Sequence, residues 1–472
     1  MSLQPSSLRF TDPGIRQLFT EHARWQSWLD VEAALARAQA QLGVIPADSA
    51  DIIAACAHLD QLDAGAIRAG LAKTGHPLVP LVWELARVCG EDAGGHVHWG
   101  ATTQNILETG DNLLLRRAHA IILGQLADLL DALAKLSHDH AATPMAGRTH
   151  GQHAVPITFG YKIAVWIDEL CRHVERLQAL EHRVFVAMLG GAAGTFASLG
   201  PEGPAVQDGM AALLGLKPTP IPSRTHRDRE AEYVCALALL ATTGGKIGNE
   251  VYTLMKQEFA EASEPVPPGT VGSSTMPQKR NPILCQDIVA SAAQVRALVP
   301  LALEAMMTEH EANRTTTVMM RAAIGPAAIH CGDILGRLVE IARGITVDPA
   351  RMLKNLDLTD GMILSEAIMM ELGREFGRQE AHDLVYDAVE HVLAGRKTFT
   401  EALEADPRIK ARLSPQSIAG LSTPGTHTGL CAEMARNSAK LAHQTANTLR
   451  RHLHAHQSQV TNFGASPGTG LP

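Results

Sequence analysis

Apolar residues recur at steps of three, four and seven through the middle of the chain. Two such series begin after Asp111, and the first comprises Leu115, Ile122, Leu126, Leu129, Leu133 and Leu136. The second comprises Ile163, Ile167, Leu170, Val174, Leu177 and Val184. A sustained period near 3.5 is typical of long helices packed nearly parallel in a bundle. Further long helices are expected at about residues 229–262, 283–309 and 318–345, which makes five in all.

The regions on either side of these helices predict shorter elements. Residues 25–42 form an amphipathic segment, and residues 75–80 are rich in glycine and proline, which interrupt helices. We therefore expect an all-α protein of three domains with a disordered, Gly-, Ser- and Pro-rich tail. The expected bounds are 1–110 for an N-terminal helical domain, 111–360 for the bundle, 361–457 for a C-terminal helical domain and 458–472 for the tail.

Composition narrows the possible partners. The 472 residues are 46% hydrophobic but only 4% aromatic, and the abundance of alanine and leucine favours helix over sheet. The net charge of −8 argues against nucleic acid as a partner. No apolar run approaches ~18 residues, so neither a membrane span nor a signal peptide is expected. The seven scattered cysteines contain no CxxC pair, which predicts a reducing, cytoplasmic location and no metal site.

The most informative segment is a predicted loop at residues 264–281. Gly272 permits unusual backbone angles, and Pro277 and Pro282 prevent a helix from running through it. Loops of this length in compact domains are usually functional or disordered. This loop carries hydroxyl groups, a lysine and an asparagine, which are the groups needed to deprotonate a carbon and to hold a carboxylate. The alternative interpretation is a glycine-rich linker.

Residues 272–282 read Gly-Ser-Ser-Thr-Met-Pro-Gln-Lys-Arg-Asn-Pro. They resemble the signature of the aspartase/fumarase superfamily, Gly-Ser-Ser-x-Met-Pro-x-Lys-x-Asn-Pro, at every fixed position. The resemblance extends over about residues 8–445 and is nearest to the branch of adenylosuccinate lyase and 3-carboxy-cis,cis-muconate cycloisomerase. It implies a five-helix bundle that joins others in the twenty-helix core of a homotetramer. It also implies active sites shared between chains, a small di- or tricarboxylate substrate, and no metal or organic cofactor.

The same resemblance assigns roles within the loop. By position, Ser273 is the general base, and Lys279 and Asn281 hold the carboxylate beside the carbon that loses its proton. A serine can act as a base only as an alkoxide that donors and cations stabilise in a closed site. Ser274 and Met276 are expected to contact the substrate.

Two other segments are candidates for substrate contacts. Residues 98–105 place Thr102, Thr103 and Gln104 before a predicted helix, where a carboxylate would be favoured. The alternative is that Thr102 or Thr103 only caps the helix. In residues 148–152, the resemblance implies that Thr149 and His150 contact the substrate, with His150 as general acid or carboxylate ligand; the alternative is an ordinary histidine. The resemblance adds further substrate-binding residues, namely His76, His98, Gln257 and Arg321, the last for a second carboxylate.

Departures from the family pattern bear on the substrate. Gln286 stands where a glutamate usually pairs with the histidine at position 150, so His150 is less strongly held as a cation. Asn105 stands where this branch usually has aspartate, and Glu108 also replaces an aspartate. Residues 312–313 are Ala-Asn, where adenylosuccinate lyases carry Arg-Ser for the nucleotide, which disfavours that substrate.

The expected reaction is a β-elimination on a substituted succinate that gives fumarate or a similar product. The preferred substrate is an N-substituted aspartate, acted on by a C–N lyase or by an epimerase of the iminodisuccinate type through elimination and re-addition. Three alternatives stay open. They are a 3-carboxy-cis,cis-muconate cycloisomerase, an adenylosuccinate lyase, and a non-catalytic protein like the lens crystallins of the superfamily.

Overall fold

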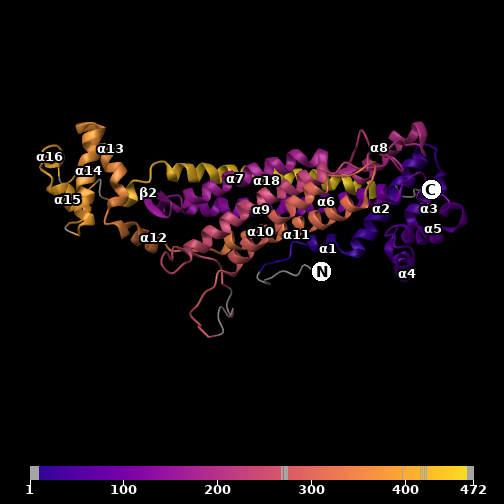
Figure 1. The fold of residues 1–472 in the computed structure, drawn as a ribbon, viewed down its shortest axis with the longest axis horizontal. Helices are drawn as coiled ribbons and strands as arrows, with labels where there is room; N and C mark the ends of the chain where they lie inside the picture. The colour runs from indigo at the N-terminus through magenta and orange to yellow at the C-terminus, as the bar shows by residue number, and fades with distance from the viewer. Residues whose placement is uncertain are drawn as a thin grey trace, which may run out of the picture.

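Long helices running side by side dominate the molecule (Figure 1). The computed structural model describes residues 10–464, apart from residues 267, 268, 270–274, 396, 415, 417, 419, 421 and 422. The prediction of a helical class with a central bundle of long helices is confirmed. The bundle consists of α6 (Thr103–Asp139), α7 (Phe159–Val184), α9 (Asp228–Leu254), α10 (Ile283–Glu304) and α11 (Arg314–Gly344).

The bundle helices form because their periodic apolar residues meet in one core. In α6, the predicted series is almost fully buried; for example, Ile122 and Leu126 have no measurable exposure. Close approach also needs small residues: a Cβ added at Gly248 of α9 would lie 2.9 Å from Ile288 Cγ2 of α10. The helix α9 ends at Leu254, short of the expected residue 262, and Ala260 beyond it adopts a left-handed φ of 52°.

Short helices gather at one end of the bundle (Figure 1). They include α2 (Glu21–Gln41), α3 (Ala47–Cys56), α4 (Ala64–Thr74), α5 (Val79–Gly94) and α8 (Gly203–Leu214), while α1 (Ile15–Leu18) lies against the bundle side. Their buried side chains belong to the same hydrophobic core as the bundle. A short parallel pair, β3 (Val186–Ala187) with β4 (Lys217–Pro218), lies beside α6 and α8. This end is therefore packed as a continuation of the bundle.

The opposite end carries its own core. There lie α12 (Pro349–Leu356), α13 (Ser365–Phe376), α14 (Arg378–Leu393), α15 (Phe399–Ala405) and α16 (Pro407–Lys410). A second hydrophobic cluster, which runs from Leu356 to Ile418 along the chain and includes Ala146, holds them together. The structure thus separates these helices from the bundle core, although the exact domain bounds remain a prediction.

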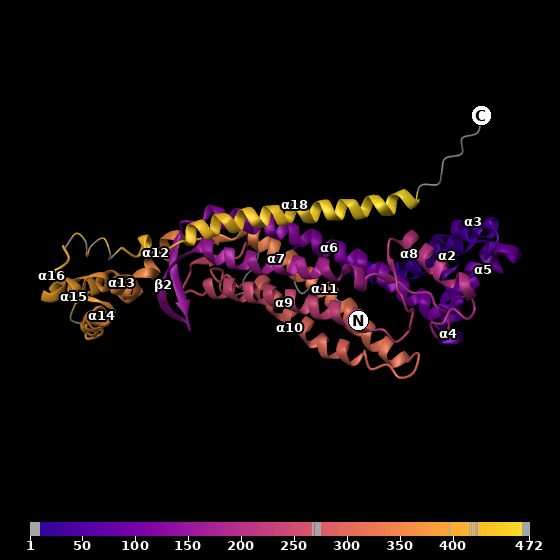
Figure 2. The ribbon, with the colours of Figure 1, turned by 90° about the horizontal axis from the view of Figure 1, so that it is seen from above.

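The last helix differs from expectation. α18 (Cys431–Gly464) returns along the bundle and packs on α6 and α7 instead of staying with the C-terminal helices (Figure 2). Its buried residues Ala435, Ala442, Ala446 and Leu449 recur at steps of seven, four and three, which explains the packing. Residues 458–464, expected in a disordered tail, instead extend α18, and residues 465–472 lie outside the described part.

A β-hairpin that the sequence did not predict follows α6. Strands β1 (Pro144–Thr149) and β2 (Gln152–Thr158) pair antiparallel. His150 and Gly151 form the two-residue turn, with φ of 54° and 76°. Positive φ at both turn residues matches the twist of a hairpin. A second antiparallel pair, β5 (Ala262–Ser263) with β6 (Thr346–Val347), lies near the same end. Within the described residues, no helix is long and apolar enough to cross a membrane.

Candidate active site

The start of α6 is a polar site at the N-terminal end of the bundle. Thr102 occupies the N-cap position, as the capping alternative expected, and its N–H donates to Asn105 Oδ1 at 3.1 Å. The same oxygen accepts from Gly191 N–H at 3.2 Å, which ties the turn after α7 to this helix end. Helix N-termini carry unpaired N–H groups and partial positive charge, so this end favours a carboxylate.

His76 lies directly beside this helix start. Its Nε2 is 3.3 Å from Thr103 Oγ1, and its Nδ1 accepts from the backbone N–H groups of Leu78 and Val79 at 3.3 and 3.4 Å. Burial lowers the pKa of His76, and the positive charges of His98 and Arg314 lower it further. His76 is therefore a neutral ring whose Nε2–H donates to Thr103.

The pKa of His98 is shifted in the opposite direction. Its Nδ1 lies 2.7 Å from Oε1 of Glu32, a residue of α2 whose side chain is only 1% exposed. Burial would lower the pKa of His98, but the charge of Glu32 and its hydrogen bond outweigh burial and raise that pKa. The structure thus brings His76 together with His98 and Thr103, which lie in a different segment of the sequence.

Gln104 faces inward, toward an ionic network. Its Oε1 accepts from Arg224 Nε at 2.7 Å, and its Nε2 donates to Arg224 O at 3.2 Å and to Glu108. Glu108 also binds Arg227; burial outweighs that cation and raises the pKa of Glu108 to about 7. Both N–H groups of Gln104 are therefore engaged, so a substrate carboxylate would have to displace one of these bonds.

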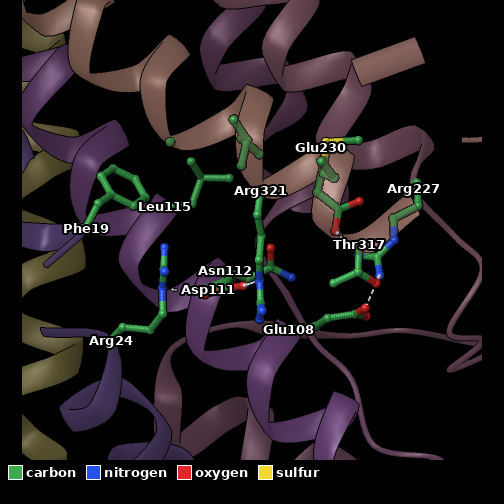
Figure 3. Close-up of a pocket in the computed structure, with 13 residues that line it drawn as sticks. Phe19, Arg24, Glu108, Asp111, Asn112, Leu115, Arg227, Glu230, Thr317 and Arg321 are labelled. Carbon is green, nitrogen blue, oxygen red and sulfur yellow. Dashed lines mark hydrogen bonds and ion pairs between the residues drawn. The ribbon is translucent and has the colours of Figure 1, made fainter. Parts of the chain in front are cut away.

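Arg321 lines a small cavity farther along α6 (Figure 3). Its Nε donates to Asp111 Oδ2 at 2.8 Å, and Arg24 approaches the other oxygen of Asp111 at 3.5 Å. The cavity, of about 40 Å³, is large enough for a few water molecules. Asp111 follows Thr103 by eight residues, or about 12 Å of helix, so Arg321 belongs to a charge cluster set back from the helix start. Its role toward a second carboxylate stays a prediction.

The hairpin lies at the other end of α6 and presents Thr149 and His150 to solvent. Its base is rigid because Arg148 forms an ion pair with Glu261, with nitrogen–oxygen distances of 3.0 and 2.6 Å. Glu261 is fully buried and also accepts from Asn355 Nδ2 at 2.7 Å. The guanidinium of Arg148 lies 5.0 Å from the ring centre of Phe259. His150 is thus an exposed group on a fixed support.

The signature loop is described in part. Ser273 and Ser274 lie outside the described residues. Met276 and Lys279 are exposed, and Asn281 is half-buried. The start of α10, directly after the loop, is held by buried Glu264, whose carboxylate accepts from Leu284 and Cys285 N–H at 3.1 and 3.0 Å. Gln257 is exposed, three residues past the end of α9 at Leu254.

The candidate residues fall into two groups at opposite ends of the bundle. The 37 residues of α6, at about 1.5 Å each, place roughly 55 Å between the residues at its start and the hairpin. His150 therefore cannot meet His76 and His98 within one chain. Among the described residues, no cluster of three or more His, Cys, Asp or Glu side chains is arranged to hold a metal ion.

Sequence inspection missed the buried carboxylates that support both ends. Of these carboxylates, only Glu32 could have been recognised from the sequence. It lies at helical spacing among the apolar residues Trp28, Leu29 and Leu35, and a charge on such a face needs a partner. Glu261 and Glu264 lie in an irregular segment where no periodic pattern distinguishes them.

Comparison with known proteins finds relatives that cover about nine tenths of the chain. A family described as "Lyase" matches residues 8–297, and one described as "Adenylosuccinate lyase C-terminus" matches residues 361–438. The N-acetyl-S-(2-succino)cysteine lyase of Enterococcus italicus is 38% identical over 424 residues, which cover 90% of this chain and 93% of that protein. The 3-carboxy-cis,cis-muconate cycloisomerase of Pseudomonas putida is 38% identical over 412 residues, or 87% and 98% of the two chains.

A solved structure agrees with these relatives. The 3-carboxy-cis,cis-muconate lactonizing enzyme from Pseudomonas putida superposes with a TM-score of 0.86 at 35% identity, covering 93% of this chain and 98% of that chain. The chain therefore belongs to the aspartase/fumarase superfamily, as residues 272–282 predicted. It is an enzyme of a class that carries out eliminations on succinate-like substrates.

Proposed function

We propose that this enzyme eliminates a heteroatom substituent from a 2-substituted succinate and releases fumarate, with an N-substituted aspartate as first candidate substrate. The observation that carries the proposal is the polar cluster at the start of α6. Its helix N-terminus, the Thr103 hydroxyl and His98, whose pKa Glu32 raises, form a place for one carboxylate. Elimination followed by re-addition on the other face would make the same site an epimerase.

The chemistry needs a base and a second carboxylate site. Ser273 takes the proton from the carbon beside one carboxylate, while Lys279 and Asn281 hold that carboxylate. Negative charge then spreads into the carboxylate as the carbanion forms. A fixed ammonium stabilises this doubly negative state more than the substrate, which lowers the barrier. His150 holds a carboxylate oxygen or gives a proton to the leaving atom.

A sulfur-linked succinate is the second candidate, favoured by two observations. Gln286 supplies no negative charge to His150, so the imidazole is a weaker proton donor than in relatives with a glutamate. A thiol has a pKa near ~8.5 and can depart as a thiolate, whereas an amine departs only after protonation. The relative from Enterococcus italicus is named for a succinylated cysteine. The weaker proton donor at position 150 and a relative named for a succinylated cysteine both suit a leaving group that departs without proton assistance.

The active site is expected to be assembled from several chains of a homotetramer. The separation of roughly 55 Å between the start of α6 and the hairpin supports this arrangement, since no single chain brings the two groups of residues together. Exposure of Thr149, His150 and Lys279 supports it as well, because these side chains are available to a neighbouring copy.

A substrate panel tests the function. The purified enzyme is offered an N-substituted aspartate, an S-(2-succino) thioether and 3-carboxy-cis,cis-muconate, and fumarate formation or loss of the muconate is followed by ultraviolet absorbance. Fumarate from either succinate supports the proposal, and inversion at the carbon that bears the substituent, without net fumarate, indicates the epimerase. Consumption of the muconate alone would identify a cycloisomerase. No turnover with any of the three would support a crystallin-like role.

A further inference from the structure

Glu32 is a buried charge with no part in the reaction as described so far. It lies on the apolar face of α2, and its Oε1 is 2.7 Å from His98 Nδ1. Its Oε2 has no hydrogen-bond partner among the described residues. A buried carboxylate is costly unless a charged or hydrogen-bonding partner compensates it. His98 is the partner available, so Glu32 acts on the protein through that ring.

A second residue of α2 holds the same segment. Gln39 lies seven residues after Glu32, which places it on the same helix face two turns along. Its Nε2 donates to the Trp99 carbonyl at 2.7 Å. His98 itself has a left-handed φ of 63°, a conformation that non-glycine residues adopt only when surrounding contacts hold them there. The face of α2 therefore fixes both the backbone and the ring at this point.

The two histidines at the helix start differ in the partners of their Nδ1 atoms. Nδ1 of His76 accepts two backbone N–H groups, which a protonated nitrogen cannot do. Nδ1 of His98 instead faces a carboxylate and must carry a proton. Nε2 of His98 has no hydrogen-bond partner among the described residues, so this atom remains available to a ligand.

We propose that Glu32 is a positioning residue that holds His98 as an imidazolium, so that His98 and the N-terminus of α6 together bind one substrate carboxylate while His76 stays neutral. This inference rests on the proposed function and names a further residue of that same site. The charged and titratable groups involved are Glu32 on α2, His76 on the loop before α5, and Arg314 at the start of α11, which acts on His76.

The decisive variant is Glu32→Gln, which keeps the shape and a hydrogen-bond acceptor but removes the charge. The pKa of His98 is raised by Glu32, so its removal lets the imidazolium lose its proton at lower pH. The alkaline limb of kcat/KM should therefore move to lower pH. At a pH above that limb, KM for the best panel substrate should rise about tenfold, while kcat stays nearly unchanged. A factor of about ten corresponds to a change of one unit in the pKa of His98.

Gln39→Met is the matched control because it removes a bond from the same helix face but leaves the charge. It should lower thermal stability without moving the pH limb. Glu32→Asp keeps the charge on a shorter side chain. Compared with Glu32→Gln, it should bring the alkaline limb at least part of the way back to its position in the parent enzyme. If Gln39→Met moves the limb as far as Glu32→Gln does, a general loosening of α2 explains both variants and the proposal is wrong.

An NMR titration separates this inference from the proposed function, since it needs no substrate. In ring-labelled parent enzyme, with signals assigned through His98→Gln and His76→Gln, His98 should lose its proton at higher pH than His76. The reverse order would overturn the proposal even if no Glu32 variant folds. If His98 titrates as expected and the shift in Glu32→Gln leaves KM unaltered for a substrate that turns over, the carboxylate-binding role is overturned and only the charge pair remains.

Discussion

The two ends of the bundle treat their histidines differently. At the start of α6, His76 and His98 are half-buried, and a neighbouring group determines the protonation of each ring. At the hairpin, His150 is exposed at the turn, and Gln286, which replaces the family's glutamate, is exposed near the start of α10. One end is therefore preorganised within a single chain. The other end presents these side chains to solvent, so their environment depends on the groups that cover them in the assembled protein.

Both ends use buried carboxylates, but at different distances from the chemistry. Glu32 contacts the His98 ring directly. Glu261 contacts Arg148 at the base of the hairpin, and Glu264 contacts the backbone that follows the signature loop. A carboxylate that touches a ring changes its charge, whereas one that holds a strand or a helix start changes only where the ring lies. The buried carboxylate at the N-terminal end therefore tunes a histidine, whereas those at the hairpin end provide rigidity.

The largest expected effect concerns the proposed general base. Ser273→Ala should leave the fold and assembly intact but reduce turnover by ~10³ or more, the scale for losing a base together with its oriented partners. Steady-state kinetics on the best panel substrate measures this effect, and Ser274→Ala provides the neighbouring hydroxyl as a control with a smaller loss. Turnover of Ser273→Ala within tenfold of the parent would exclude Ser273 as the base.

The next largest effect is expected from a variant that tests whether Glu261 has a structural role. Glu261→Gln leaves Arg148 buried beside an uncharged partner, which should lower the free energy of unfolding by about 3 kcal/mol. Urea denaturation measures the loss. The control is Glu232→Gln, which breaks the exposed pair with Arg183 and should cost less than about 1 kcal/mol. Equal losses for the two variants would contradict the structural role of the buried pair.

Subunit mixing tests whether each active site takes Ser273 and His150 from different chains. Ser273→Ala and His150→Asn variants, each inactive alone, are mixed under conditions that reshuffle subunits. If every site takes these two residues from different chains, about a quarter of the sites in a random mixture regain both, and activity returns to a similar fraction. A mixture that stays inactive although mass spectrometry shows exchanged subunits would mean that the sites are not shared.

The smallest effect is expected from giving His150 a carboxylate partner, as His98 has at the other end of the bundle. Gln286→Glu adds the charge that His150 lacks and should favour its imidazolium, so the matching limb of the pH–rate profile should move up by less than about one pH unit. Release of an amine should gain more from this change than release of a thiol, because only the amine needs the proton. A limb that stays in place would show that position 286 serves packing alone.

Local patterns in the sequence were sufficient for the helices and the family. The apolar period along residues 115–136 predicted α6, since helical side chains three, four and seven apart share one face. The signature at residues 272–282 identified the superfamily because its chemistry lies in one short segment. The N-cap at Thr102 was also an expected local alternative, which the structure contains.

Only the tertiary structure revealed the contacts between distant residues. Glu32 and His98 are 66 residues apart, and Arg148 and Glu261 are 113 apart, so no periodic pattern connects either pair. The return of α18 along the bundle likewise depends on the packing of a narrow stripe of alanines against α6 and α7. Helix formation follows from neighbouring residues, whereas the charge of a histidine follows from whichever group packing places beside it.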